Sequence, residues 1–289
     1  MKARAFLTLA IALPLLAGCS ALDHGFLNAQ GPVADHERHL FGVVVAILSF
    51  VWIPIVILVP AFAWHYRLSN TKDAYRPKWA FSWPLEGFIW LPPFAIVIVL
   101  AIILWPATKR DDPYTRLAEQ GTPIRIQAIA LDWKWVFIYP DQHVATVNQL
   151  AIPAGRPVQL QLTSGTVMQS LLLPQLAGQI YTMAGMRTRL NFEADRPGRY
   201  MGENVQFNGD KFAHQKFAIV SMTPAAYRTW LAEAARVKRP LNASAWASLS
   251  KRDLVYPTTF SSVTEHFFDW VVSKDGGDAH VHPKHSEAM

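Results

Sequence analysis

The chain of 289 residues contains a single cysteine, Cys19. One thiol cannot form an internal disulfide. It also cannot supply a zinc site of four cysteines, a redox-active pair of thiols or a copper centre bridged by two thiolates. Charged residues are scarce too, at 17% of the chain, against about 25% in an average soluble domain. Together with a hydrophobic share of 51%, this scarcity points to a membrane protein.

The signature motifs of several enzyme classes are also missing. The sequence has no Walker loop, no GxGxxG, no HExxH and no GxSxG. Its net charge of +6 comes from basic residues spread along the chain, without the basic stripe and interleaved aromatic residues that bind a phosphate backbone. We therefore expect no nucleic-acid partner.

Residues 1–18 have the features of a lipoprotein signal peptide. Lys2 and Arg4 precede an apolar stretch, residues 5–16, that is too short to span a bilayer. The residues that follow it, Leu-Ala-Gly-Cys, resemble the lipobox of bacterial lipoproteins. This resemblance implies cleavage before Cys19 and lipidation of its sulfur. A stray cysteine in an ordinary signal peptide is the alternative.

Two apolar runs without a charged residue follow, at 40–64 and 88–108. Each reaches the roughly 20 residues that a transmembrane helix needs, so we expect residues 40–108 to form a two-helix transmembrane hairpin. A lipidated Cys19 places residues 19–39 in the periplasm, and four basic residues place the loop between the helices in the cytoplasm. The chain after Lys109 is then exported.

Residues 123–222 change to short alternating segments separated by proline and glycine, which predicts strands. The candidate strands are 124–129, 132–139, 147–152, 158–162, 171–173, 179–181, 188–193, 198–200 and 217–220. About eight strands in this length predict an all-β sandwich. Trp133 and Trp135 are expected to be strand and core residues.

Residues 223–275 are expected to form a helical extension. Thr223 followed by Pro224 is typical of a helix start, and further short helices are predicted at 243–249 and 262–272. The His-rich residues 276–289 are expected to be a disordered tail, with metal binding by the tail as the alternative.

Several stretches carry a specific family resemblance. They are residues 63–67, 132–140, 145–148 and 178–190. With the lipobox and the two apolar runs, they resemble subunit II of the haem-copper terminal oxidases, and within these the subunit II of cytochrome bo-type ubiquinol oxidases. The resemblance implies a cupredoxin-like fold for the exported sandwich.

In the cytochrome c oxidase branch of that family, this domain holds a binuclear copper centre with histidine, cysteine, glutamate and methionine ligands. The resemblance aligns the ligand positions with Gln169, Asn204, Gln206, Asn208, Phe212 and Gln215. None of these side chains offers the thiolate, imidazole or thioether that such a centre needs. We therefore expect no metal in this chain. A weaker mononuclear copper site made from His214 and Met168 is the alternative.

The resemblance implies that the chain is subunit II of a proton-pumping ubiquinol oxidase in the bacterial inner membrane, which oxidises ubiquinol and reduces oxygen to water. This chain is then expected to be non-catalytic, to hold no cofactor and to support the assembly of subunit I. Subunit I is expected to carry haem b, haem o and copper and to bind ubiquinol. Subunits III and IV and membrane lipid are the other expected partners.

Glu86 is an acidic residue at the cytoplasmic start of the second apolar run. Ionisable groups at membrane boundaries are often functional, and the resemblance places Glu86 at the entrance of the proton pathway called the K-channel in subunit I. The alternative is a solvated carboxylate that the helix dipole favours. For the whole chain, the alternatives are an exported copper-binding or copper-sensing lipoprotein and a cytochrome c oxidase subunit II.

Overall fold

The computed structural model describes residues 25–70, 78–117 and 121–274. The predicted signal peptide, Cys19 and the His-rich tail lie outside the described residues. The chain divides into two units, Met1–His36 with Pro113–Met289, and Glu37–Asp112.

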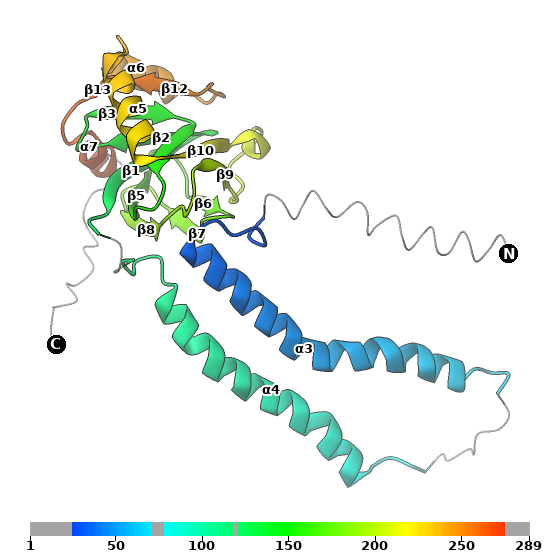
Figure 1. Cartoon of the computed structure of the whole chain (residues 1–289). Helices are drawn as coiled ribbons and strands as arrows, with labels where there is room; N and C mark the ends of the chain where they lie inside the picture. The colour runs from blue at the N-terminus through cyan, green and yellow to red at the C-terminus, as the bar shows by residue number, and fades with distance from the viewer. Residues whose placement is uncertain (1–24, 71–77, 118–120, 275–289) are drawn as a thin grey trace, which may run out of the picture. The chain divides into compact units, whose positions relative to one another are not determined.

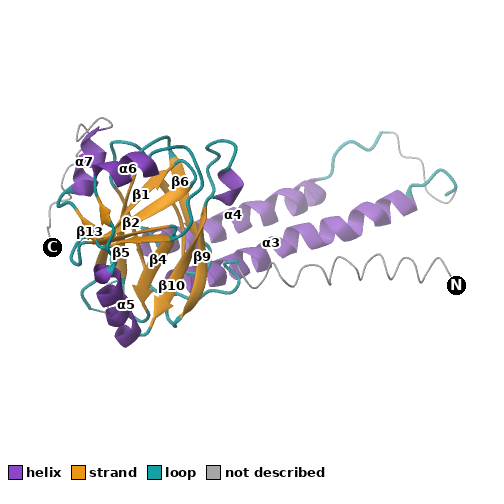
Figure 2. Ribbon diagram, turned by 90° about the horizontal axis from the view of Figure 1, so that it is seen from above, coloured by secondary structure: helices purple, strands orange, loops and turns teal. Residues whose placement is uncertain are grey.

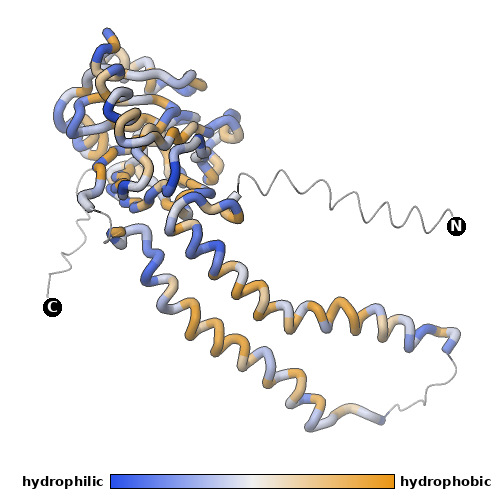
Figure 3. The backbone as a smooth tube through the Cα atoms, in the orientation of Figure 1, coloured by the Kyte–Doolittle hydropathy of each residue, from blue (hydrophilic) through white to orange (hydrophobic). Residues whose placement is uncertain are grey.

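Two long helices, α3 (Pro32–His65) and α4 (Trp83–Arg110), correspond to the two apolar runs (Figure 1). Both are long and apolar enough to span a membrane. In each helix apolar residues fill the middle and polar residues lie toward the ends, as Figure 3 shows. The helix α3 contains Pro54 and Pro60 and changes direction partway along (Figure 1), because proline removes a backbone hydrogen bond within a helix. It also begins earlier than the apolar run and includes the charged turn with Asp35.

The predicted β-sandwich is confirmed, and Figure 2 shows its strands from a second direction. One sheet has the order β12-β3-β2-β1-β5-β8 and the other has the order β4-β10-β9-β6-β7. The strands between Ile124 and Met222 are β1 (Ile124–Leu131), β2 (Lys134–Tyr139), β3 (Val144–Val147), β4 (Gln149–Pro153), β5 (Val158–Ser164), β6 (Gln169–Leu173), β7 (Ala177–Thr182), β8 (Thr188–Phe192), β9 (Gly198–Asn204) and β10 (Lys216–Met222).

The single strand predicted at 147–152 is wrong. The first sheet's β3 ends at Val147, and β4 begins at Gln149 in the other sheet. Asn148 lies between them with a φ of 53°, a left-handed conformation that asparagine tolerates better than most residues. Its side chain accepts a hydrogen bond from the Trp135 backbone N–H at 2.9 Å and donates one to the Val255 carbonyl at 2.6 Å. The chain therefore crosses from one sheet to the other at Asn148.

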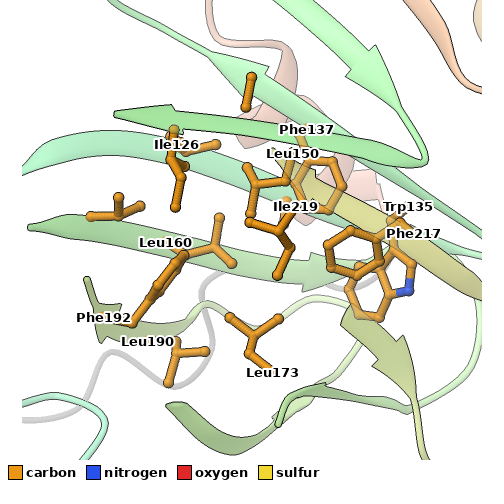
Figure 4. Close-up of a cluster of buried hydrophobic side chains, with 14 of the residues drawn as sticks. Ile126, Trp135, Phe137, Leu150, Leu160, Leu173, Leu190, Phe192, Phe217 and Ile219 are labelled. Atoms are coloured by element: carbon orange, nitrogen blue, oxygen red, sulfur yellow. The ribbon is translucent and has the colours of Figure 1, made fainter. Parts of the chain in front are cut away.

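The core lies between the two sheets, and Figure 4 shows its side chains. Gly202 faces Phe217 across the β9–β10 pair, and a Cβ atom at Gly202 would collide with the Phe217 ring. The missing side chain lets this ring lie over the strand and pack at 4.8 Å from Phe137 and 5.9 Å from Trp135, centre to centre.

Of the residues after Met222, Tyr227 and Ala234 pack with the core between the sheets, whereas residues from Leu241 onward cover the outer face of the first sheet. The residues after Met222 form α5 (Pro224–Arg236), α6 (Ala243–Leu249) and α7 (Phe267–Lys274), with β11 (Pro240–Leu241), β12 (Thr258–Phe260) and β13 (Ser262–Val263). The helix predicted at 243–249 is confirmed. The helix predicted at 262–272 is wrong in its first half, where β13 pairs with β11. A second buried cluster contains Ile129, Val136, Ile138, Ala145, Trp246, Leu249, Phe268 and Val271.

Lys134 in β2 connects the C-terminal extension, the residues after Met222, to the first sheet through hydrogen bonds. Its side chain is fully buried, and its Nζ donates hydrogen bonds to the carbonyls of Leu249 at 2.9 Å and Lys251 at 2.7 Å, at the end of α6. A cation is favourable beside the carbonyl end of a helix. Burial lowers the pKa of Lys134, and the nearby Asp132 and Asp253 oppose that change.

Candidate functional site

Four carboxamide side chains meet at one end of the sandwich. Gln169 begins β6, Asn204 ends β9, Asn208 lies in the loop that follows, and Gln215 precedes β10. Their exposed fractions are 0%, 4%, 8% and 1%. Buried polar groups need hydrogen-bond partners because they have lost water, and these four side chains provide partners for one another.

Gln215 is the centre of this carboxamide network. Its Nε2 donates to Gln169 Oε1 at 2.5 Å and to the Leu131 carbonyl at 3.1 Å. Its Oε1 accepts from Asn204 Nδ2 at 3.0 Å and from Asn208 Nδ2 at 2.7 Å. A carboxamide has two donor hydrogens and two acceptor lone pairs. Gln215 therefore uses its full hydrogen-bonding capacity inside the protein.

Asn204 extends the network to the backbone of two neighbouring segments. Its Oδ1 accepts from the N–H groups of Ser170 and Gln206, both at 3.0 Å, and its Nδ2 also donates to the Gln206 carbonyl at 2.9 Å. Gln169 Nε2 donates to Thr166 Oγ1 at 3.2 Å. The network thus joins β6, the end of β9 and the loop after it.

The six aligned positions divide into two groups. Gln169, Asn204, Asn208 and Gln215 contribute their side chains to the network, whereas Gln206 contributes only backbone groups. Phe212 lies in a short 3-10 helix, η1 (Phe212–His214), and its ring packs edge to face with Phe207 at 5.8 Å between centres. The structure therefore brings four of the six side chains into one hydrogen-bonded group.

The residues of this network do not fit a binuclear copper centre. Thiolates bridge the two ions of such a centre and imidazole completes it, whereas the side chains here are neutral carboxamides bonded to one another. Within residues 25–70, 78–117 and 121–274, no group of three or more His, Cys, Asp and Glu residues could hold a metal ion. His214 is exposed and lines a groove with Tyr200 and Lys216, and Met168 is exposed in the loop before β6.

The tryptophans beside the network occupy two different settings. Trp135 in β2 is fully buried in the core, as expected. Trp133 is buried, but the strand predicted for it is wrong, because it lies in the turn between β1 and β2 with a φ of 65°. The Arg252 guanidinium and the Lys211 ammonium lie 5.3 Å and 5.6 Å from the centre of the Trp133 ring.

The sequence did not predict that Arg252 and Lys211 would lie beside Trp133, because each forms an ion pair with an acidic residue that is distant in the chain. Arg252 forms an ion pair with Asp132 at 3.0 Å, and Lys211 forms one with Asp253 at 2.6 Å. Arg252 and Asp253 belong to the extension that folds over the sheet. A hydrogen bond from Lys211 lowers the pKa of Asp253.

Glu86 lies in the first turn of α4, in the other unit of the chain. Its side chain is half-buried, and its Oε2 accepts a hydrogen bond from Trp90 Nε1 at 3.0 Å, one helical turn further on. This hydrogen bond orients the Glu86 carboxylate toward Trp90. Cys19 lies outside the described residues.

Two apolar helices of membrane-spanning length followed by a β-sandwich fit the class of membrane proteins with an exported domain. The chain is 38% identical over 294 residues to the cytochrome bo(3) ubiquinol oxidase subunit 2 of Pseudomonas aeruginosa, covering 98% of this chain and 88% of the relative. It is 37% identical over 262 residues to the ubiquinol oxidase subunit 2 of Acetobacter aceti, covering 90% and 84%. The chain belongs to the family of ubiquinol oxidase subunit 2.

No family model matches the chain. Among solved structures, the periplasmic domain of subunit II of cytochrome oxidase from Bradyrhizobium japonicum is similar, with 19% sequence identity and a TM-score of 0.38. The superposition covers 39% of the present chain and 95% of the Bradyrhizobium japonicum domain. The family assignment rests on the sequence relatives alone.

Replacing the central carboxamide tests the network. We expect Gln215→Leu to lower the free energy of unfolding by about 3 kcal/mol, because it leaves the Leu131 carbonyl, Gln169 Oε1 and Asn208 Nδ2 buried without partners. Urea unfolding of the full chain in detergent, followed by tryptophan fluorescence, measures the change. The matched control is Gln179→Leu, at an exposed position of β7. Equal stability of the two variants would show that the network contributes nothing.

Proposed function

We propose that this chain is the non-redox subunit II of a proton-pumping ubiquinol oxidase. The complex oxidises ubiquinol, reduces oxygen to water and conserves the energy as a proton gradient. In this proposal haem b, haem o, copper and the ubiquinol site belong to subunit I, and subunits III and IV complete the assembly. The present chain then lies in the bacterial inner membrane, anchored by α3, α4 and a lipid on Cys19, with its sandwich in the periplasm.

The carboxamide network is the observation that carries this proposal. At the positions where the family resemblance places copper ligands, the structure has four buried amides that use one another as hydrogen-bond partners. An electron cannot enter such a site, because amides have no accessible redox state. The donor must therefore deliver electrons to another subunit, which supports quinol oxidation within the membrane over electron transfer from a soluble protein.

A role in assembly is supported by exposed apolar side chains beside the network. Val167 and Met168 in the loop before β6 are 54% and 44% exposed, and Phe207 in the loop after β9 is 72% exposed. Both loops adjoin the network, since the Val205 N–H donates to the Ser170 carbonyl at 3.0 Å. An apolar surface of this kind is typical of a contact with another protein. We propose that it packs against subunit I.

Purification of the chain with its partners tests the assignment. From membranes solubilised in a mild detergent, we expect the tagged full chain to co-purify with a haem-bearing subunit, to show b-type and o-type haem in its optical spectrum, and to oxidise ubiquinol. A chain that purifies without haem would contradict the oxidase assignment.

Glu86 is proposed to stand at a proton entrance of subunit I. We expect Glu86→Gln to slow ubiquinol turnover without changing the haem content, because the amide cannot take up and release a proton at neutral pH. The amide oxygen can still accept the hydrogen bond of Trp90, so the local helix geometry is kept. Oxygen consumption and proton release by the purified complex in liposomes measure the effect.

Trp90→Phe is the matched control for Glu86, because it removes the hydrogen bond that Glu86→Gln keeps and leaves the carboxylate in place. We expect this variant to turn over like the unmodified complex. If Trp90→Phe were as slow as Glu86→Gln, turnover would be sensitive to any change in this helix turn, and the slow turnover of Glu86→Gln would not identify a proton carrier. Unaltered turnover and pumping in Glu86→Gln would remove the proton-entry role.

A further inference from the structure

A pocket of about 890 Å³ lies at the end of the sandwich away from the carboxamide network. Its walls come from the start of β1, the turns that join β2 to β3 and β4 to β5, and the beginning of α5. Pockets that bind small molecules have volumes of about 300–1,000 Å³. This one is therefore large enough for a ligand.

The strand β1 shows that the pocket and the network are separate sites. Ile124 at its start lines the pocket, and Leu131 at its end bonds to Gln215. Eight residues of strand at about 3.4 Å each span roughly 24 Å. The pocket is thus independent of the site that carries the proposed function.

The charge around this pocket is strongly positive. Four arginines line it, and Asp141 is the one acidic residue among the described residues of its lining. The arginines are Arg116, Arg125, Arg156 and Arg228. Asp141 forms an ion pair with Arg125 at 2.7 Å. Across the part of the chain that the structure describes, the other three arginines form no ion pair. Within residues 25–70, 78–117 and 121–274, three positive charges therefore line the pocket without an ion-pair partner.

One hydrogen bond to the backbone orients the Arg156 side chain. Arg156 Nε donates to the Thr122 carbonyl at 3.1 Å, which ties the β4–β5 turn to the segment before β1. A guanidinium group is planar and can donate two parallel hydrogen bonds to the oxygens of one phosphate. The use of arginine at all four basic positions favours a phosphate over a simple inorganic anion such as chloride.

Tyr227 supplies a buried donor in the same pocket. It lines the pocket, its side chain is 94% buried, and its Oη has no hydrogen-bond partner among the described residues. Buried hydroxyl groups without a partner are rare and need an explanation. Burial raises the pKa of Tyr227 to about 12, against the effect of the nearby Arg156. The hydroxyl therefore keeps its proton at neutral pH and can donate it to an anion.

The helix α5 adds to the attraction for an anion. It begins at Pro224 after the N-cap Thr223, and both Pro224 and Arg228 line the pocket. The positive end of the helix dipole lies at this first turn. Arginine side chains, Tyr227 and the start of α5 thus line one cavity.

We propose that this pocket binds a phosphate-bearing anion, held by Arg116, Arg156, Arg228 and the hydroxyl of Tyr227. The phosphate belongs either to a soluble compound or to the headgroup of an anionic phospholipid, and the contacts to the phosphate oxygens are the same in both.

Calorimetric titration of the purified full chain in detergent tests this site. One arm uses inorganic phosphate and the other uses short-chain phosphatidylglycerol, both at constant ionic strength set with sodium chloride. We expect saturable binding in at least one arm. Binding in the phosphate arm alone identifies a soluble ligand as the source. Binding in the phosphatidylglycerol arm identifies a lipid headgroup. Absence of binding in both arms would overturn the proposal.

Three variants separate the site from general surface charge. We expect Arg156→Gln with Arg228→Gln to weaken binding by at least about tenfold, which corresponds to the loss of charge-assisted hydrogen bonds. Tyr227→Phe keeps the ring and is expected to weaken binding without lowering the melting temperature. Arg236→Gln, an exposed arginine at the other end of α5, is expected to bind like the unmodified chain. Equal affinities in the double variant and in Arg236→Gln would overturn the proposal.

Discussion

The carboxamide of Gln215 is the contact on which one end of the sandwich depends. It bonds to β1 through Leu131, to β6 through Gln169, to β9 through Asn204 and to the following loop through Asn208. A metal ion could join the same segments, but it would need charged or soft ligands on each of them. Here neutral side chains join them by hydrogen bonds. The loop geometry is therefore kept by groups that neither carry charge nor exchange electrons.

The segment from Asp132 to Trp135 connects this end of the sandwich to the rest of the domain. Trp135 points into the core beside Phe217, while Lys134 points to the outer face and binds the end of α6. Trp133 lies in the turn before β2, and the Arg252 and Lys211 cations lie near its ring. Because both faces of β2 are buried, the C-terminal extension is part of the folded domain and not an appendage. Residues 132–135 therefore contact the core, the C-terminal extension and the loop after β9.

The sequence predicted the features that depend on local pattern. Apolar runs of sufficient length predicted α3 and α4, alternation predicted most strands, and Thr223-Pro224 predicted the start of α5, where the Thr223 side chain accepts from the Ala226 N–H. The change of sheet at Asn148 could not be predicted, because it depends on a left-handed backbone and on a hydrogen bond to Val255, which is distant in the sequence. The strand β12 was missed for the same reason, since its partner β3 is remote.

The candidate site was predicted in part. The alignment of ligand positions identified Gln169, Asn204, Asn208 and Gln215 as a group, but no pattern in the sequence showed that Gln215 would be the common partner of the others. Phe212 was placed in the same group by alignment, and the structure packs it against Phe207 instead. The four arginines that line the pocket beside α5 come from four separate segments, so only the fold brings them together.

The copper content of the purified chain tests the central claim most directly. The chain is shortened to residue 275, which removes the histidines of 276–289, then incubated with copper and dialysed against a chelator. The account predicts that no stoichiometric copper remains and that no absorption band of a thiolate-copper centre appears. One or more copper ions retained per chain would contradict it.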